Sequence, residues 1–165
     1  MSEFWSWIGY SLVLGVGATL ACDLWGQLVR LVTGIPPLDW RLVGRWLGHM
    51  PGQFRHDSIG RARPVRGEAL LGWTAHYLTG VLLAAALLGL FGIDWVETPR
   101  FFEALGFGLA TVLLPFFIMQ PALGAGIAAR RTPQPMRARL LSLCTHGAFG
   151  VGLWCSAILL NALHG

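Results

Sequence analysis

Four polar residues interrupt the apolar stretches of this sequence, and their types suit proton transfer or metal binding. They are Asp23, His76, Gln120 and His146. A carboxylate and an imidazole in contact can relay protons, and two imidazoles with a carboxylate can hold a divalent metal. Two histidines on different helices can also ligate a b-type haem. A structural hydrogen-bond network is the fourth interpretation, and the residue types leave all four open.

The four residues share a similar depth in their stretches. Each lies seven to ten positions from a charged residue that bounds its stretch on one side, namely Arg30, Glu68, Arg130 and Arg139. At a rise of 1.5 Å per residue, each is about 10–15 Å from that boundary of a helix. We therefore expect one polar layer, with His76, His146 and Asp23 as the candidate metal ligands. A carboxylate inside a membrane costs about 2.5–3.5 kcal/mol, so Asp23 should face neighbouring helices.

Two further sets of residues stand out by type and spacing. His49, His56 and Asp57 lie in a stretch rich in glycine and proline, and they could form a second metal or anion site, or interfacial hydrogen bonds. Gly72 and Gly80 flank His76 at four-residue steps, and Gly150 follows His146 by the same step. Small residues at this spacing let helix backbones approach closely in lipid, so we expect these glycines to pack helices.

The elements that must position these residues are apolar helices. The chain has 165 residues, of which 55% are hydrophobic and only 12% charged, which favours lipid as the solvent. Residues 4–22, 69–93, 104–129 and 140–165 carry no formal charge. A bilayer core needs about 20 apolar residues per helix, and the stretches lack the alternation of a barrel strand. We predict an all-α, four-helix transmembrane bundle forming one domain over 1–165, with helices near 7–32, 69–92, 102–129 and 140–162.

The arginines orient these helices. All of them except Arg100 lie in the first and last connections, so the positive-inside rule places the loop 33–68 and the segment 130–139 in the cytoplasm. Both termini then lie outside the cytoplasm. The prediction is a multi-pass membrane protein, in contact with the lipid bilayer and with no nucleic-acid partner.

The connections and helices have some internal organisation. In the loop 33–68, apolar Leu38, Leu42 and Trp46 recur at four-residue steps, which predicts a short amphipathic helix at the cytoplasmic interface. Pro115 and Pro121 should kink the third helix. The second and fourth helices share the pattern His-x-x-x-Gly-Val-x-Leu, so the chain could also consist of two parallel helical-hairpin repeats.

Several strings resemble one known family. GRWLGHMPGQFRHDSI (44–59), MQPALGAGIAARRTPQP (119–135), SLCTHGAFGVGL (142–153) and CDLW (22–25) are similar to a bacterial membrane family catalogued as domain of unknown function 2938. The resemblance covers nearly the whole chain. It implies a bacterial inner-membrane location and supplies no activity and no catalytic residues.

No motif identifies an enzyme. The sequence contains no P-loop, no G-x-S-x-G and no H-E-x-x-H, so we predict no catalytic residues. The leading hypothesis is a membrane protein that handles a proton, ion or small solute at the polar layer. One alternative is a non-catalytic partner that assembles as a homo-oligomer or stabilises a larger membrane complex, and another is a metal- or haem-binding membrane protein. We expect no cofactor, with metal or b-type haem as the exceptions.

Overall fold

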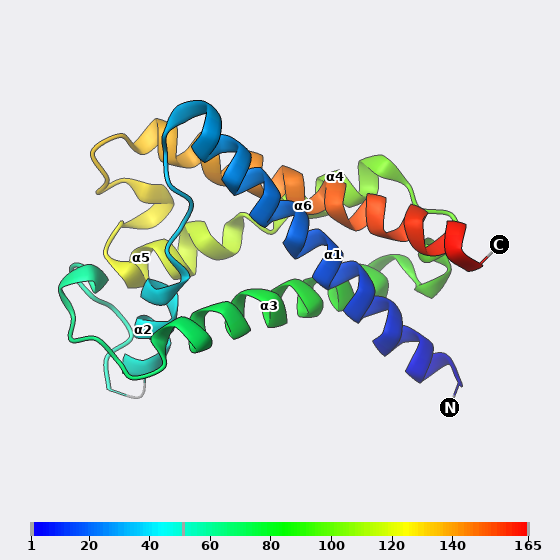
Figure 1. Cartoon of the computed structure of the whole chain (residues 1–165), viewed down its shortest axis with the longest axis horizontal. Coiled ribbons are helices and arrows are strands. Elements are labelled where there is room, and N and C mark those ends of the chain that lie inside the picture. Colours follow the sequence, from blue (N-terminus) through cyan, green and yellow to red (C-terminus); the bar gives the residue numbers. More distant parts are fainter. Residues whose placement is uncertain (1, 51, 165) are drawn as a thin grey trace. The chain divides into compact units, whose positions relative to one another are not determined.

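The computed structural model describes residues 2–50 and 52–164, and all regular structure in that part of the chain is helical. Four of the described stretches are long and apolar enough to cross a membrane, namely Glu3–Thr33, Glu68–Phe91, Phe101–Leu123 and Pro135–Leu163. A short helix, α2 (Trp40–His49), lies between the first two in sequence (Figure 1). This confirms the predicted all-α class with four apolar helices and a short loop helix.

Three of the four stretches are continuous helices, α1 (Ser2–Thr33), α3 (Glu68–Phe91) and α6 (Pro135–His164). The α1 helix ends where the N–H of Gly34 donates to the Arg30 carbonyl at 2.9 Å. Proline is accommodated as the first residue of α6, because an N–H there would have no helical acceptor. Several leucines on these helices point outward: Leu24, Leu90 and Leu159 are 71%, 67% and 62% exposed, as expected of helices in lipid.

The third stretch is interrupted, and its prolines explain where. It consists of α4 (Phe101–Ala110), then the π turn η3 (Pro115–Met119), and then α5 (Gln120–Leu123). Pro115 has no N–H for the Thr111 carbonyl, which instead accepts from Leu114 at 3.1 Å. Pro121 likewise cannot donate to Phe117, and the N–H of Gln120 reaches back to Pro115, the bond of a π turn.

The third stretch also ends earlier than the predicted range 102–129. Helix α5 stops at Leu123 because Gly124 takes a left-handed conformation (φ 99°) and its N–H turns back to Gln120 and Pro121. This is a common helix end, and glycine adopts it without a steric penalty. Residues 124–129 form a loop with a short 3₁₀ turn, η4 (Ile127–Ala129).

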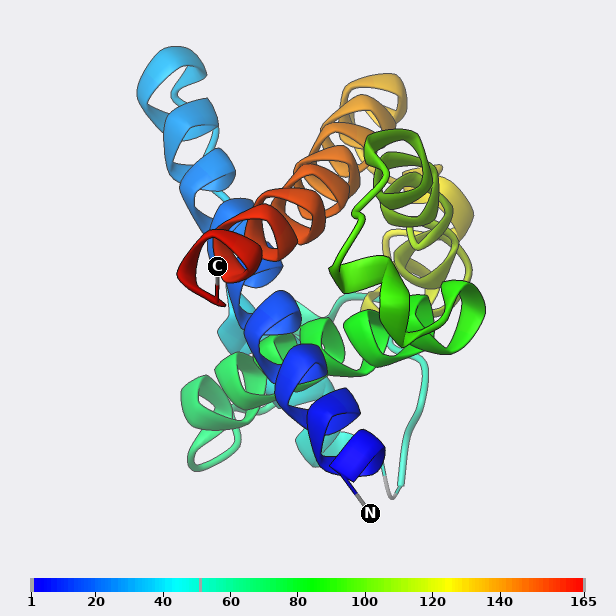
Figure 2. The same ribbon diagram turned by 90° about the vertical axis from the view of Figure 1, so that its right-hand side faces the viewer.

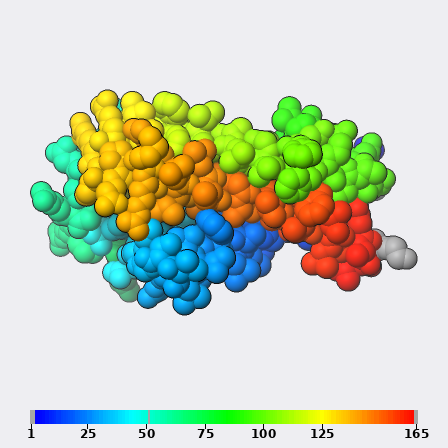
Figure 3. All heavy atoms as spheres, turned by 90° about the horizontal axis from the view of Figure 1, so that it is seen from above, coloured from blue at the N-terminus to red at the C-terminus, as the bar shows by residue number. Residues whose placement is uncertain are grey.

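The chain divides into two compact units. Unit 1 comprises Met1–Pro37, Tyr77–Ala110 and Thr145–Gly165. Its buried core draws on all three segments, with Leu14 from α1, Leu87 from α3 and Leu153 from α6 fully buried. Figure 2 shows α1 (blue) crossing α3 (green). The end of α6 (red in Figure 3) lies against the 3₁₀ turn η2 (Ile93–Val96), where Asn161 donates to the Val96 carbonyl at 2.8 Å.

Unit 2 comprises Leu38–His76 and Thr111–Cys144. Its smaller core consists of Val43 and Trp46 from α2, Ile59 from the 3₁₀ turn η1 (Ile59–Arg61), and Ala122 from α5. The Asp39 side chain caps the start of α2 by accepting from the N–H of Arg41 at 3.0 Å. From Leu38 onward, the loop between the first two spans therefore packs within unit 2. The assembly of the four spans into one bundle, and their pairing as two repeats, stay predictions.

Candidate functional site

Asp23 makes a hydrogen bond to a residue that the sequence did not single out. It is half-buried on α1, and the hydroxyl of Tyr77 on α3 donates to its Oδ2 at 2.9 Å. Glycines let the two helices approach closely. A Cβ on Gly80 would collide with the Thr19 hydroxyl, and one on Gly15 with the Val81 Cα. Small residues one and two turns before Asp23 thus bring the carboxylate within reach of the phenol.

His146 lies on α6 in the same unit. Its imidazole is in hydrogen-bonding contact with the backbone of Gly108 on α4. The helices α4 and α6 meet through glycines, since a Cβ on Gly108 would lie 2.6 Å from the Cα of Gly150. The Cys22 thiol contacts the Thr145 carbonyl at 3.5 Å. This contact joins α1 to α6 through residues that directly precede Asp23 and His146.

His76 and Gln120 belong to unit 2. The His76 ring stacks on Trp40 of α2, with centroids 3.8 Å apart and planes at 19°. The Gln120 amide donates to the Ser142 hydroxyl at 3.2 Å. The Oε1 of Gln120 is buried and has no hydrogen-bond partner within residues 2–50 and 52–164. The predicted polar-layer residues are thus shared between the two units, and their convergence stays a prediction.

Metal binding was one interpretation of these side chains. Among the residues that the structure describes, no group of three or more His, Cys, Asp and Glu side chains is arranged to hold a metal ion.

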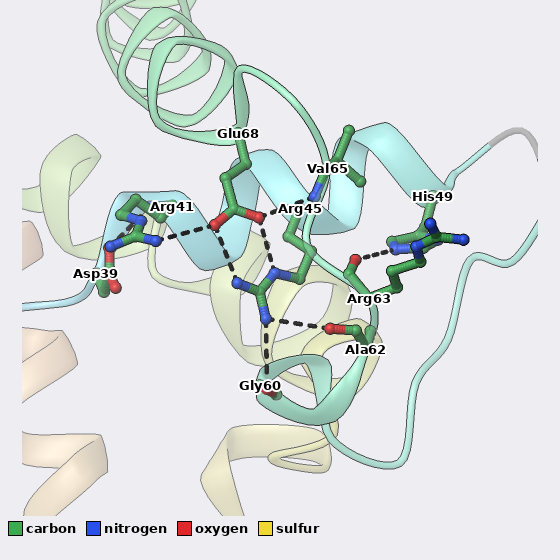
Figure 4. A network of polar contacts seen from close by, with 9 residues as sticks. All are labelled: Asp39, Arg41, Arg45, His49, Gly60, Ala62, Arg63, Val65 and Glu68. Carbon is green, nitrogen blue, oxygen red and sulfur yellow. Dashed lines mark hydrogen bonds and ion pairs between the residues drawn. The ribbon is translucent and has the colours of Figure 1, made fainter.

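A second polar network, missed in the sequence, attaches α2 to the start of α3 (Figure 4). Arg45 binds Glu68 through two parallel bonds, Nε to Oε2 at 2.8 Å and Nη2 to Oε1 at 2.9 Å. Both side chains are about nine-tenths buried. Arg45 Nη1 also donates to the carbonyls of Gly60 and Ala62, at 3.3 and 3.2 Å. The bond to Glu68 raises the pKa of Arg45, so this guanidinium stays charged.

Close backbone packing supports the same attachment. Gly44 on α2 and Gly72 on α3 are both buried. A Cβ on Gly72 would collide with the Trp40 carbonyl, and one on Gly44 with the Glu68 carbonyl. Glycine is therefore required on both helices for α2 to lie directly on α3.

His49 is the last residue of α2, and His56 and Asp57 lie in the loop that follows this helix. The Nε2 of His49 is 2.9 Å from the Arg63 carbonyl oxygen, and the His49 and His56 rings meet edge to face at 5.5 Å. The backbone N–H of His56 donates to the Ala122 carbonyl at 2.9 Å. The Asp57 carbonyl packs against Gly124, where a Cβ would collide with it. The segment that carries His56 and Asp57, called the histidine loop from here on, is thus fixed to the end of the third span.

Comparison with known proteins gives one match. A family described as "Protein of unknown function (DUF2938)" matches residues 12–160. No curated protein and no solved structure matches the chain. Because the matched region includes all but the two ends, the chain belongs to the DUF2938 family.

Proposed function

We propose that this chain is a multi-pass inner-membrane protein that binds and releases a proton at Asp23, alone or coupled to a small solute. The observation that carries the proposal is the hydrogen bond from Tyr77 to the Asp23 carboxylate. The orientation belongs to the proposal, with the arginine-rich loop 33–68 and segment 130–139 in the cytoplasm and both termini outside.

The position of Asp23 supports this function. The other acidic residues within the four apolar stretches, Glu3, Glu68 and Glu103, lie in the first three residues of their stretches. Asp23 lies well inside the first stretch, where a charged carboxylate is unfavourable. Acidic residues at such positions commonly mark proton or ion pathways.

The partner of Asp23 also suits proton transfer. A phenol can donate to a carboxylate or accept from a protonated carboxyl group, so the Tyr77 bond can persist in both protonation states of Asp23. The two groups come from different helices, α1 and α3. A change in protonation would therefore exchange the donor and the acceptor in a contact between helices, and such an exchange can couple a proton to the movement of a solute.

The alternative function is a non-catalytic partner in a membrane complex, and glycine-rich helix faces could serve such an assembly. The structure uses these glycines within the chain itself. A Cβ on Gly72 would collide with Trp40, one on Gly80 with Thr19, and one on Gly150 would lie 2.6 Å from the Ala104 carbonyl oxygen. The glycines therefore give no separate support for a partner surface.

Proton flux into proteoliposomes tests the proposal. With a membrane potential imposed by potassium and valinomycin, a pH-sensitive dye should report faster proton entry than in empty liposomes. Asp23→Asn should abolish the excess flux and Tyr77→Phe should slow it. Glu97→Gln removes one exposed acidic charge outside the spans and should leave it unchanged. Equal flux from wild type and Asp23→Asn would refute the role of Asp23.

A further inference from the structure

Unit 2 contains a cavity of about 250 Å³ that is separate from the Asp23–Tyr77 pair. Three segments line it: the histidine loop, the end of the third span, and the loop that follows that span. The lining residues are Arg55, His56, Asp57, Phe117, Pro121, Gly126, Ile127, Arg130 and Arg131. The close contacts of His56 with Ala122 and of Asp57 with Gly124 hold these segments together.

The charge of the lining favours an anion. Arg55, Arg130 and Arg131 contribute three positive charges against the single negative charge of Asp57. Guanidinium groups bind phosphate oxygens in pairs of parallel hydrogen bonds and keep their charge at any physiological pH. Three arginines around one cavity therefore suit a phosphate group better than a neutral or cationic ligand.

The backbone that presents two of these arginines is held in an unusual conformation. Ala128 and Ala129 both have left-handed dihedral angles (φ 47° and 58°), which are costly for alanine. The Arg139 guanidinium donates to the Ala128 carbonyl at 2.8 Å, and the Arg131 N–H donates to the Ala125 carbonyl at 2.8 Å. Strain of this kind persists when the surroundings fix it, and it is frequent where a loop holds a ligand.

The packing of Gly126 places the two arginine stems side by side. A Cβ on Gly126 would lie 2.9 Å from the Cγ of Arg130 and 3.0 Å from that of Arg131. Both side chains therefore pass close to Gly126, which also lines the cavity.

Two other features of the lining describe the ligand further. His56 is 8% exposed, and its Nε2 has no hydrogen-bond partner within the described residues, so the wall includes a buried group whose polar capacity is unused. Phe117 and Ile127 are 56% and 44% exposed and give the cavity an apolar side. A phosphate group attached to an apolar body would match both sides.

We propose that this cavity binds the phosphate group of an anionic ligand through Arg55, Arg130 and Arg131. A phospholipid headgroup and a soluble phosphate share this chemistry. Basic pockets at the membrane boundary are known to recognise lipid headgroups, and the apolar side of the cavity fits a lipid.

Binding to the purified full-length protein in detergent tests the proposal. The probes are a short-chain phosphatidylglycerol, a diacylglycerol with the same chains and no phosphate, and inorganic phosphate. Phosphatidylglycerol should bind, and Arg130→Gln/Arg131→Gln should weaken binding by about tenfold or more. The matched control is Arg66→Gln/Arg137→Gln, which removes the same charge from residues outside the cavity lining and should change affinity less than about twofold.

The outcomes separate the two sources of phosphate. Binding of phosphatidylglycerol alone identifies a lipid headgroup, whereas inorganic phosphate that binds with the same dependence on the cavity arginines identifies a soluble ligand. Equal binding of diacylglycerol, an equal loss in the control variant, or no binding of either phosphate probe would overturn the proposal. Arg55 lines the cavity from a different segment, so Arg55→Gln should also weaken binding. This second variant keeps the test decisive if the double variant does not fold. Asp23→Asn should leave this binding unchanged.

Discussion

The contact between Gly72 and α2 predicts opposite effects for the same substitution at two places on α3. Gly72→Ala adds a Cβ that collides with the Trp40 carbonyl. Gly89→Ala adds a Cβ on the same helix where nothing lies within 4 Å, and Gly89 is exposed. The first variant should loosen α2, and the second should not.

The magnitude follows from two opposing effects. Glycine to alanine inside a helix gains about 0.5–1 kcal/mol from backbone entropy, and this gain applies at both positions. Overpacking costs about 1–3 kcal/mol, and the upper part of this range applies to Gly72 because a backbone carbonyl cannot rotate away. We therefore expect Gly72→Ala to lose about 1–2 kcal/mol of α2 docking free energy and Gly89→Ala to be neutral or slightly stabilising.

Trypsin cleavage after Arg45 measures this difference locally. Arg45 is 8% exposed, so the protease reaches it only when α2 has left α3. A loss of 1–2 kcal/mol raises the open population about 5–30-fold, and cleavage follows that population when reclosing is fast. Cleavage after Arg55, which is exposed, provides the internal reference. Similar cleavage after Arg45 in Gly72→Ala and Gly89→Ala would refute the reasoning.

Three further predictions concern the Arg45–Glu68 ion pair, the buried core of unit 1 and the loop at Ala128. Glu68→Gln should increase cleavage after Arg45 far more than Arg41→Gln, because Glu68 is buried in two bonds to Arg45 whereas the Arg41 side chain is 59% exposed; equal effects would contradict this. Leu153→Ala should lower the free energy of unfolding in detergent by about 2–5 kcal/mol, because this side chain is fully buried. The control Leu159→Ala, at a 62% exposed position, should cost less than about 0.5 kcal/mol. Ala128→Gly should raise the free energy of unfolding in detergent by about 1 kcal/mol, because glycine relieves the left-handed conformation. A decrease in that free energy would show that the loop is not strained at this position.

The four long apolar helices could be predicted from the sequence because a stretch without charged residues is recognised without knowing the fold. The uncharged stretches predict apolar helices, and the four-residue steps of Leu38, Leu42 and Trp46 predict a short helix, which the structure begins two residues later, at Trp40. These signals need no knowledge of which helices are neighbours. The same is true of Pro115, whose missing N–H breaks the third span wherever that span lies.

The side-chain contacts between helices could not be predicted in this way. Tyr77 binds Asp23 across 54 positions in the chain, and a tyrosine next to a histidine in a leucine-rich helix carries no signal of its own. The apolar steps of Leu38, Leu42 and Trp46 place Arg45 on the polar side of an amphipathic helix, yet the structure buries it against Glu68. The sequence did contain a signal for the early end of the third span. Gly124 and Gly126, two residues apart, are typical of a left-handed helix end.

The π turn η3 contains one more residue in its hydrogen-bonded ring than an α turn does. The wider turn takes up this residue, so the side chains before and after it keep about the phase of a regular helix that is one residue shorter. Deleting a single residue between Pro115 and Met119 would therefore restore ordinary winding and leave the amide of Gln120 near Ser142. Family members whose third span lacks the extra residue should thus be aligned with a one-residue gap within η3.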